Sequence, residues 1–170
     1  MIDFEVDKDK AKAALLYVCA NVSNIDKLKL YKILYFAEQK HLIEFGRPIT
    51  GDAFIKMKYG PVPSFVKDKI ENKLLENDGS VNTDKNFVIA NEYPDLDELS
   101  ESDIKCLDDS IAENKDKSFG KLSFDSHKLA WNNAKDSCRL SSLDIALEGN
   151  AETGMLKYIS SLIEDNLEFH

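Results

Sequence analysis

Three histidines are the side chains of this chain that could transfer a proton near neutral pH: His41, His127 and His170. Ser126 precedes His127, so the two have the residue types of a nucleophile and its general base. Neighbours on a helix point about 100° apart, however, whereas such a pair must be within hydrogen-bond reach. We therefore expect His127 to be structural, with its ring bonded to the backbone or a carboxylate. Among the functions considered for this chain, an enzyme that uses His127 ranks below the two binding functions.

No other pattern indicates a catalytic, metal or cofactor site. Adjacent acids such as Asp108 and Asp109 do not have the register of a calcium-binding loop. The three cysteines, Cys19, Cys106 and Cys138, are too widely spaced for a disulfide framework or a zinc site. The 7 glycines form neither of the glycine-rich phosphate-binding patterns. We expect no catalytic residue, no metal and no cofactor.

The charge of the chain is unevenly distributed. Its 22 Lys and Arg and 31 Asp and Glu give a net charge of −9, which argues against general binding of nucleic acid or anionic membranes. Residues 27–73 nevertheless hold ten basic and five acidic side chains, a surplus of +5. This surplus is either a solvated face or a patch for an acidic partner or a phosphate backbone. The lysines that would contact phosphates are Lys27, Lys29, Lys32, Lys56 and Lys58.

Aromatic residues offer a second kind of binding surface. Tyr31 and Tyr35 have helical spacing, and Tyr59 precedes a rigid turn that contains Gly60 and Pro61. Such residues form either core packing or an aromatic groove, because Tyr and Trp are common anchors in protein interfaces.

These candidate residues must be positioned by a mainly helical fold. With 170 residues, of which 43% are hydrophobic, the chain is long enough for one compact domain over 1–170. Apolar residues at helical spacing predict a first helix over 11–22. A second helix over 27–45, capped by Asn24 or Asp26 and stopped by Gly46, is apolar around most of its circumference. We expect it to be the central helix.

A small β element follows. Residues 55–59 alternate as a half-exposed strand, and the run 60–63 breaks it. Pro63 then lies in the first turn of a third helix, whose inner face holds Val66, Ile70 and Leu74 and which ends at 77–79. Residues 81–89 suggest a small hairpin.

The second half is again helical. Ser100 and Asp103 resemble a capping box before one helix, and Ser118 caps a short one with Phe119 and Leu122 directed inward. A helical turn at 129–131 and a terminal amphipathic helix over 152–166 complete the prediction. The chain shows no signal peptide and no apolar run long enough to span a membrane, so we expect a cytoplasmic protein without a membrane partner.

Four motifs resemble those of one family. The run LKLYKILYFA at 28–37 resembles the signature of the Panacea domain, the SocA-like group of phage-associated antitoxins. Residues 41–49, with HL and GRPI, and residues 58–63, KYGPVP, are similar to its next two elements. Ser126, His127 and Trp131 resemble its later SH…W element. Order and spacing agree across about 26–132, which leaves an N-terminal helix and a C-terminal helical extension outside the match.

The resemblance implies a non-enzymatic antitoxin, encoded beside its toxin in a bacterium, prophage or phage. Members of this family bind and neutralise a cognate toxin directly, or deliver it as an adaptor to a bacterial protease, and an acidic surface would complement a basic toxin. The alternative is a regulator that binds the operator DNA of its own toxin–antitoxin operon. The partner-binding candidates are Tyr31, Tyr35, His41, Arg47, Tyr59, Gly60, Pro61, Pro63, Ser126, His127 and Trp131.

Overall fold

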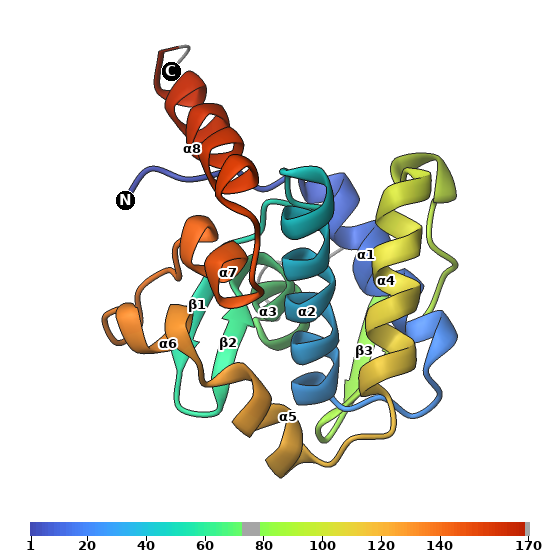
Figure 1. Cartoon of the computed structure of the whole chain (residues 1–170). Coiled ribbons are helices and arrows are strands. Elements are labelled where there is room, and N and C mark those ends of the chain that lie inside the picture. Colours follow the sequence, from blue (N-terminus) through green and yellow to red (C-terminus); the bar gives the residue numbers. More distant parts are fainter. Residues whose placement is uncertain (73–78, 169–170) are drawn as a thin grey trace.

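The computed structural model describes residues 1–72 and 79–168, so Leu74 lies outside the described residues. The third helix, predicted to end at 77–79, ends earlier, at Glu71. The described chain is mainly helical, with two small antiparallel sheets, as the sequence predicted (Figure 1). The elements are α1 (Lys8–Asn21), α2 (Lys27–Phe45), β1 (Phe54–Met57), β2 (Gly60–Pro63), α3 (Ser64–Glu71), β3 (Val81–Asp84), β4 (Phe87–Ala90), α4 (Glu101–Asn114), α5 (Phe119–Ser126), α6 (Leu129–Asn133), α7 (Ser142–Glu148) and α8 (Thr153–Glu168).

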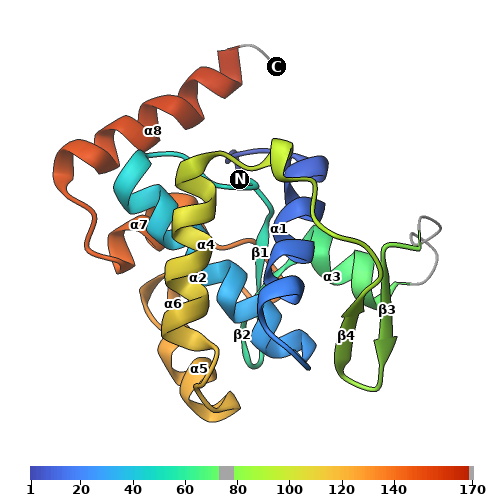
Figure 2. The ribbon, with the colours of Figure 1, turned by 90° about the vertical axis from the view of Figure 1, so that its right-hand side faces the viewer.

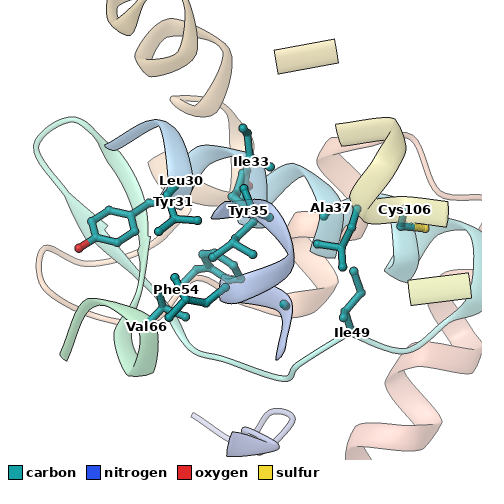
Figure 3. Packing of buried hydrophobic residues seen from close by; sticks show 14 of the residues in the cluster. Leu30, Tyr31, Ile33, Tyr35, Ala37, Ile49, Phe54, Val66 and Cys106 are labelled. Atoms are coloured by element: carbon teal, nitrogen blue, oxygen red, sulfur yellow. The ribbon is translucent and has the colours of Figure 1, made fainter. Parts of the chain in front are cut away.

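Helix α2 is the centre of the molecule, which confirms the prediction from its apolar circumference. It packs against α1, α4, α5, α7 and β2 (Figures 1 and 2). Asp26, not Asn24, caps its start by accepting a hydrogen bond from the Lys29 amide at 2.9 Å. The Tyr35 ring meets the Phe54 ring edge-on at 5.3 Å inside the core (Figure 3).

Residues 60–63 do not simply end the first strand, as the sequence suggested, but form the strand β2. Its register pairs Phe54 with Pro63 and Lys56 with Pro61. The Phe54 carbonyl and the backbone amide and carbonyl of Lys56 point to the opposite edge, where the Lys56 amide donates to the Cys138 carbonyl at 2.8 Å. Both prolines therefore occupy positions where the ladder needs no N–H from them. Pro63 is the N-cap residue that precedes α3, and not a residue of its first turn as predicted, because the helix begins at Ser64.

The hairpin and the helices predicted in the second half are present, but one side chain points elsewhere than expected and one helix was missed. The β3–β4 hairpin, the capping box of α4 and the Ser118 cap of α5 are present. Leu122 is buried as expected, whereas Phe119 is 48% exposed and does not point inward. Helix α7, which the sequence did not reveal, packs against α2, α6 and α8.

Two buried carboxylates hold the loop between α2 and β1. Glu38 accepts hydrogen bonds from the Thr50 amide at 2.9 Å and its hydroxyl at 2.6 Å. Asp52 accepts from the amides of Phe65 and Val66, at 2.9 and 3.1 Å, in the first turn of α3. Burial raises the pKa of both carboxyls, although these hydrogen bonds act in the opposite direction. The two acids are occupied by backbone amides and by the Thr50 hydroxyl, and they organise the loop.

Candidate interaction site

Three segments that carry the sequence motifs meet at the tip of the β1–β2 hairpin. His127 Nε2 lies 2.9 Å from the Lys58 carbonyl, and Trp131 Nε1 donates to the Met57 carbonyl at 2.8 Å. Lys32 Nζ reaches the tip from α2 and donates to the Pro61 carbonyl at 2.9 Å. We call Lys32, Ser126, His127 and Trp131 the hairpin clasp. Figure 1 shows the tip beside α5 and α6, which bring the last three of these residues to it.

Gly60 is the hairpin residue that this clasp surrounds. Its φ of +112° is one that side chains rarely adopt. A Cβ atom here would lie 2.4 Å from Ser126 Oγ and 2.8 Å from Lys32 Cε, far inside van der Waals contact. The close approach of hairpin, α2 and α5 therefore requires glycine at this position.

The clasp uses Ser126 and His127 structurally. The buried Ser126 hydroxyl donates to the Ser123 carbonyl at 3.0 Å and does not face the imidazole. His127 Nδ1 faces the carbonyl and hydroxyl of the same Ser123, while Nε2 faces the Lys58 carbonyl. The ring also packs on Trp131, with centroids 4.3 Å apart. The expectation that His127 bonds the backbone is confirmed, and the geometry of a Ser126–His127 pair is not present.

The tip itself carries exposed apolar side chains. Met57 is 37% exposed, Tyr59 45% and Phe119 48%. The rings of Tyr59 and Phe119 meet edge-on with centroids 5.2 Å apart, and Lys58 Nζ lies 5.3 Å from the Tyr59 ring centre. We call Met57, Lys58, Tyr59 and Phe119 the hairpin-tip patch. It presents two aromatic rings and one cation on a support fixed by the clasp.

Three other predicted contact residues belong to the interior, so their side chains form no surface. Tyr31, Tyr35 and His41 are at most 1% exposed. The hydroxyl of Tyr35 donates to Glu148 at 2.9 Å, and burial raises its pKa far above the usual value. His41 Nε2 lies 3.2 Å from Asp103, and burial lowers the histidine pKa. Tyr31 and Tyr35 have the core role that the sequence left open, whereas His41, predicted as a contact residue, is enclosed in the interior.

The other family-motif residues are distributed along α2 and the hairpin. Gly60, Pro61 and Pro63 are buried. Arg47 is exposed, but it follows α2 at the end opposite to the hairpin clasp (Figure 1). Tyr59 is therefore the predicted contact residue that is exposed and also lies on the hairpin held by the clasp.

The five candidate lysines do not form one phosphate-binding track. Lys27 pairs with Glu71, and Lys29 donates to the Lys115 carbonyl at 2.6 Å. Lys32 is 2% exposed, and burial lowers its pKa to about 8. Lys56 lies over the Trp131 ring at 4.1 Å, while Lys58 is exposed at the tip. The ammonium groups of Lys27, Lys29, Lys32 and Lys56 therefore interact with other groups of the chain.

Sequence reasoning missed two residues of this region. Phe119 follows a cap at Ser118 and resembles a core position, so nothing in the pattern indicated that its ring would meet Tyr59. Glu148 accepts hydrogen bonds from Tyr35, from Gln39 at 2.9 Å and from the Ala130 amide at 3.2 Å. These partners are up to 113 residues away, and no local signal marks such a contact.

A group of acidic side chains has the spacing of metal ligands. Among the residues that the structure describes, Asp7, Asp9 and Glu98 bring their carboxylates within 4.8 Å of one another. They are largely exposed, and exposed acids gather in this way without an ion, so we assign no metal to them. No helix within the described ranges is both long and apolar enough to cross a membrane.

One comparison with known proteins finds a relationship. A family model described as "Antitoxin SocA-like, Panacea domain" matches residues 30–132, more than half of the chain. The comparisons with curated proteins and with solved structures find no match to the chain. The matched range runs from α2 to α6 and includes the hairpin clasp and the hairpin-tip patch, whereas α1, α7 and α8 lie outside it.

Proposed function

The chain belongs to the SocA-like antitoxin family with a Panacea domain, and from this premise we propose that it neutralises a cognate toxin by binding it. The observation that carries the proposal is the convergence of motif residues on one hairpin. Lys32 and the half-buried His127 and Trp131 bond to the hairpin as part of the hairpin clasp, and the exposed surface they support contains Tyr59 and Phe119. This role needs a specific surface and no reaction at His127.

The hairpin-tip patch is suited to anchoring a protein partner. Tyrosine and other aromatic side chains contribute a large part of interface energy when a partner removes them from water. The clasp holds the tip with hydrogen bonds from His127, Trp131 and Lys32, so little conformational freedom is lost on binding. We therefore place the toxin contact at this patch.

The net charge of the chain also supports a protein partner, and specifically a basic one. The net charge of −9 attracts a basic protein over long range and repels acidic ones. The apolar patch then supplies the contact that holds the complex. Long-range attraction and short-range anchoring are therefore assigned to different parts of the surface.

Direct neutralisation and adaptor-mediated proteolysis both begin with this binding step. They differ in what happens to the toxin afterwards. Direct neutralisation leaves the toxin intact in the complex, whereas an adaptor lowers its abundance only in cells that contain the protease. We propose direct neutralisation, because a rigid patch that stays bound to the toxin is sufficient for it.

The test is co-expression with the product of the neighbouring gene. We expect that product to stop growth alone, and this chain to restore growth and to co-purify with an undiminished amount of it. A harmless neighbour with which no complex forms would refute the antitoxin assignment. Rescue that disappears in protease-deficient cells, with toxin levels recovering there, would replace direct neutralisation by the adaptor mechanism.

A further inference from the structure

A second surface feature, a groove, lies away from the hairpin clasp. It runs between the end of α1 with the residues that follow it, and the β3–β4 hairpin with the residues after β4; the lining includes residues 19, 20, 22, 24, 84 and 87–93. Its volume is about 840 Å³, in the range of sites that hold peptides and small ligands. We call it the α1–β4 groove. Figure 2 shows the hairpin standing beside α1 at the edge of the molecule.

The groove exposes apolar side chains that have no cover from the described part of the chain. Phe87 is 45% exposed, Ile89 47% and Tyr93 89%. Val88, between the first two, is buried, so Phe87 and Ile89 project from the same, outer face of β4. Large apolar side chains that gather at one exposed site indicate an interaction surface.

On the edge of β4 away from β3, pairing with the preceding chain covers only part of the strand. On the edge away from β3, the Val88 amide donates to the Ile25 carbonyl at 2.9 Å, and the Asn86 carbonyl accepts from Lys27. This pairing stops at Asn24, whose φ of +53° turns the chain away. Because amides alternate along a strand, those of Ala90 point to the same edge as those of Val88. An extended segment can continue the pairing there.

The charged residues that line the groove, Asp84 and Glu92, are both acidic. Lys12 reaches Glu92 at 2.9 Å, but Glu92 remains 45% exposed and can accept a further donor. An acidic segment would meet these carboxylates together with the overall charge of −9, whereas a Lys or Arg would be attracted.

We infer that the α1–β4 groove binds an extended peptide segment of a protein partner. Its apolar side chains pack on Phe87, Ile89 and Tyr93, its backbone pairs with the free end of β4, and its Lys or Arg faces Asp84 or Glu92. This is strand addition to an open sheet edge. The groove shares no residue with the hairpin-tip patch, so the inference stands apart from the proposed toxin contact.

The test is selection from a phage-displayed library of random octapeptides on the full-length chain. Binders are counter-selected on the Ile89→Lys variant, which adds a cation to the outer face of β4. We expect the enriched peptides to carry net positive charge and alternating apolar residues. The best peptide, labelled with fluorescein, should bind the wild-type chain with a Kd at least tenfold below that for Ile89→Lys. Phe124→Lys, at a residue 72% exposed on α5, is the matched control and should change Kd less than twofold.

Three results would overturn the inference. The first is a library without any sequence that distinguishes wild type from Ile89→Lys. The second is enrichment of acidic peptides. The third is a concentration-dependent dimer that Ile89→Lys dissociates in light scattering, since the groove's occupant would then be a second copy of this chain. A failure of toxin co-purification, in contrast, leaves these readouts unchanged.

Discussion

At the residue scale, Gly60 shows what the sequence motif at the hairpin accomplishes. Its positive φ and its distance from Ser126 and Lys32 leave no space for a methyl group. We predict that Gly60→Ala lowers the free energy of unfolding by about 2–4 kcal/mol, from backbone strain and steric overlap. Urea denaturation followed by circular dichroism measures it.

A matched glycine provides the control for this prediction. Gly120 is in α5, and nothing lies within 4 Å of the position of its added Cβ. Gly120→Ala should therefore raise the free energy of unfolding by about 0.5–1 kcal/mol, as alanine does in helices. Equal effects of the two substitutions would show that Gly60 is not enclosed by the clasp.

Lys32 makes the clasp sensitive to pH. Burial lowers its pKa from 10.5 to about 8, so between these values the unfolded chain binds more protons than the folded one. The free energy of unfolding contributed by Lys32 therefore rises with pH across this window, by up to about 3 kcal/mol. The full cost of burying the cation is present below pH 8.

Replacement of this lysine by an isosteric apolar residue tests that cost. We predict that Lys32→Met raises the free energy of unfolding at pH 7 by about 1–2 kcal/mol, after loss of the bond to Pro61 is subtracted. The gain should shrink as pH rises from 8 to 10 in urea denaturation series. A gain that is constant over this range, or the same trend for Lys157→Met on the exposed side of α8, would contradict the assignment.

At the scale of elements, α5 and α6 hold the β1–β2 hairpin through His127 and Trp131. We predict that His127→Gln keeps the fold but costs about 1 kcal/mol, because the bond to the Lys58 carbonyl is weakened. Hydrogen exchange should accelerate at Tyr59 and Gly60, while the β3–β4 hairpin remains unchanged. If hydrogen exchange at the tip is unaltered, and a reaction catalysed by the wild-type chain is lost in His127→Gln, the enzyme hypothesis is favoured instead.

The elements also show where prediction from sequence succeeds. Helices α1, α2 and α4 follow from apolar periodicity and their caps, which are local signals. Strand β2 was not predicted, because two prolines argue against a strand until the partner strand's register is known. The bonds of Glu148 to Tyr35 and Gln39 join residues more than 100 positions apart, so no local pattern indicates them.

The candidate site was predictable to a smaller extent. The motifs lie in the segments that meet at the hairpin. The backbone bonding of His127 could be predicted because Ser126, its neighbour on a helix, points in another direction. Sequence could not separate supporting from exposed positions, since Tyr31 and His41 are enclosed by chain segments distant in sequence, such as Glu71 and Asp103. Exposure of Phe119 likewise depends on the hairpin that it meets.

At the scale of the whole molecule, the uneven charge has a structural explanation. Four lysines of the basic surplus in 27–73 interact within the fold, namely Lys27, Lys29, Lys32 and Lys56. The acidic balance of the chain thus dominates long-range encounters, with apolar surfaces at the hairpin-tip patch and the α1–β4 groove. This arrangement favours protein partners of basic character.

The most direct measurement is the Kd between the purified toxin and the chain with Tyr59→Ala, Phe119→Ala or both, by isothermal titration calorimetry. If the hairpin-tip patch anchors the toxin, each substitution should weaken binding about tenfold or more, as for aromatic anchors. Phe124→Ala, an equally aromatic but separate position on α5, should leave Kd within about twofold of wild type. Unchanged affinity of the Tyr59→Ala, Phe119→Ala double variant, with its fold intact, would contradict the proposed toxin contact.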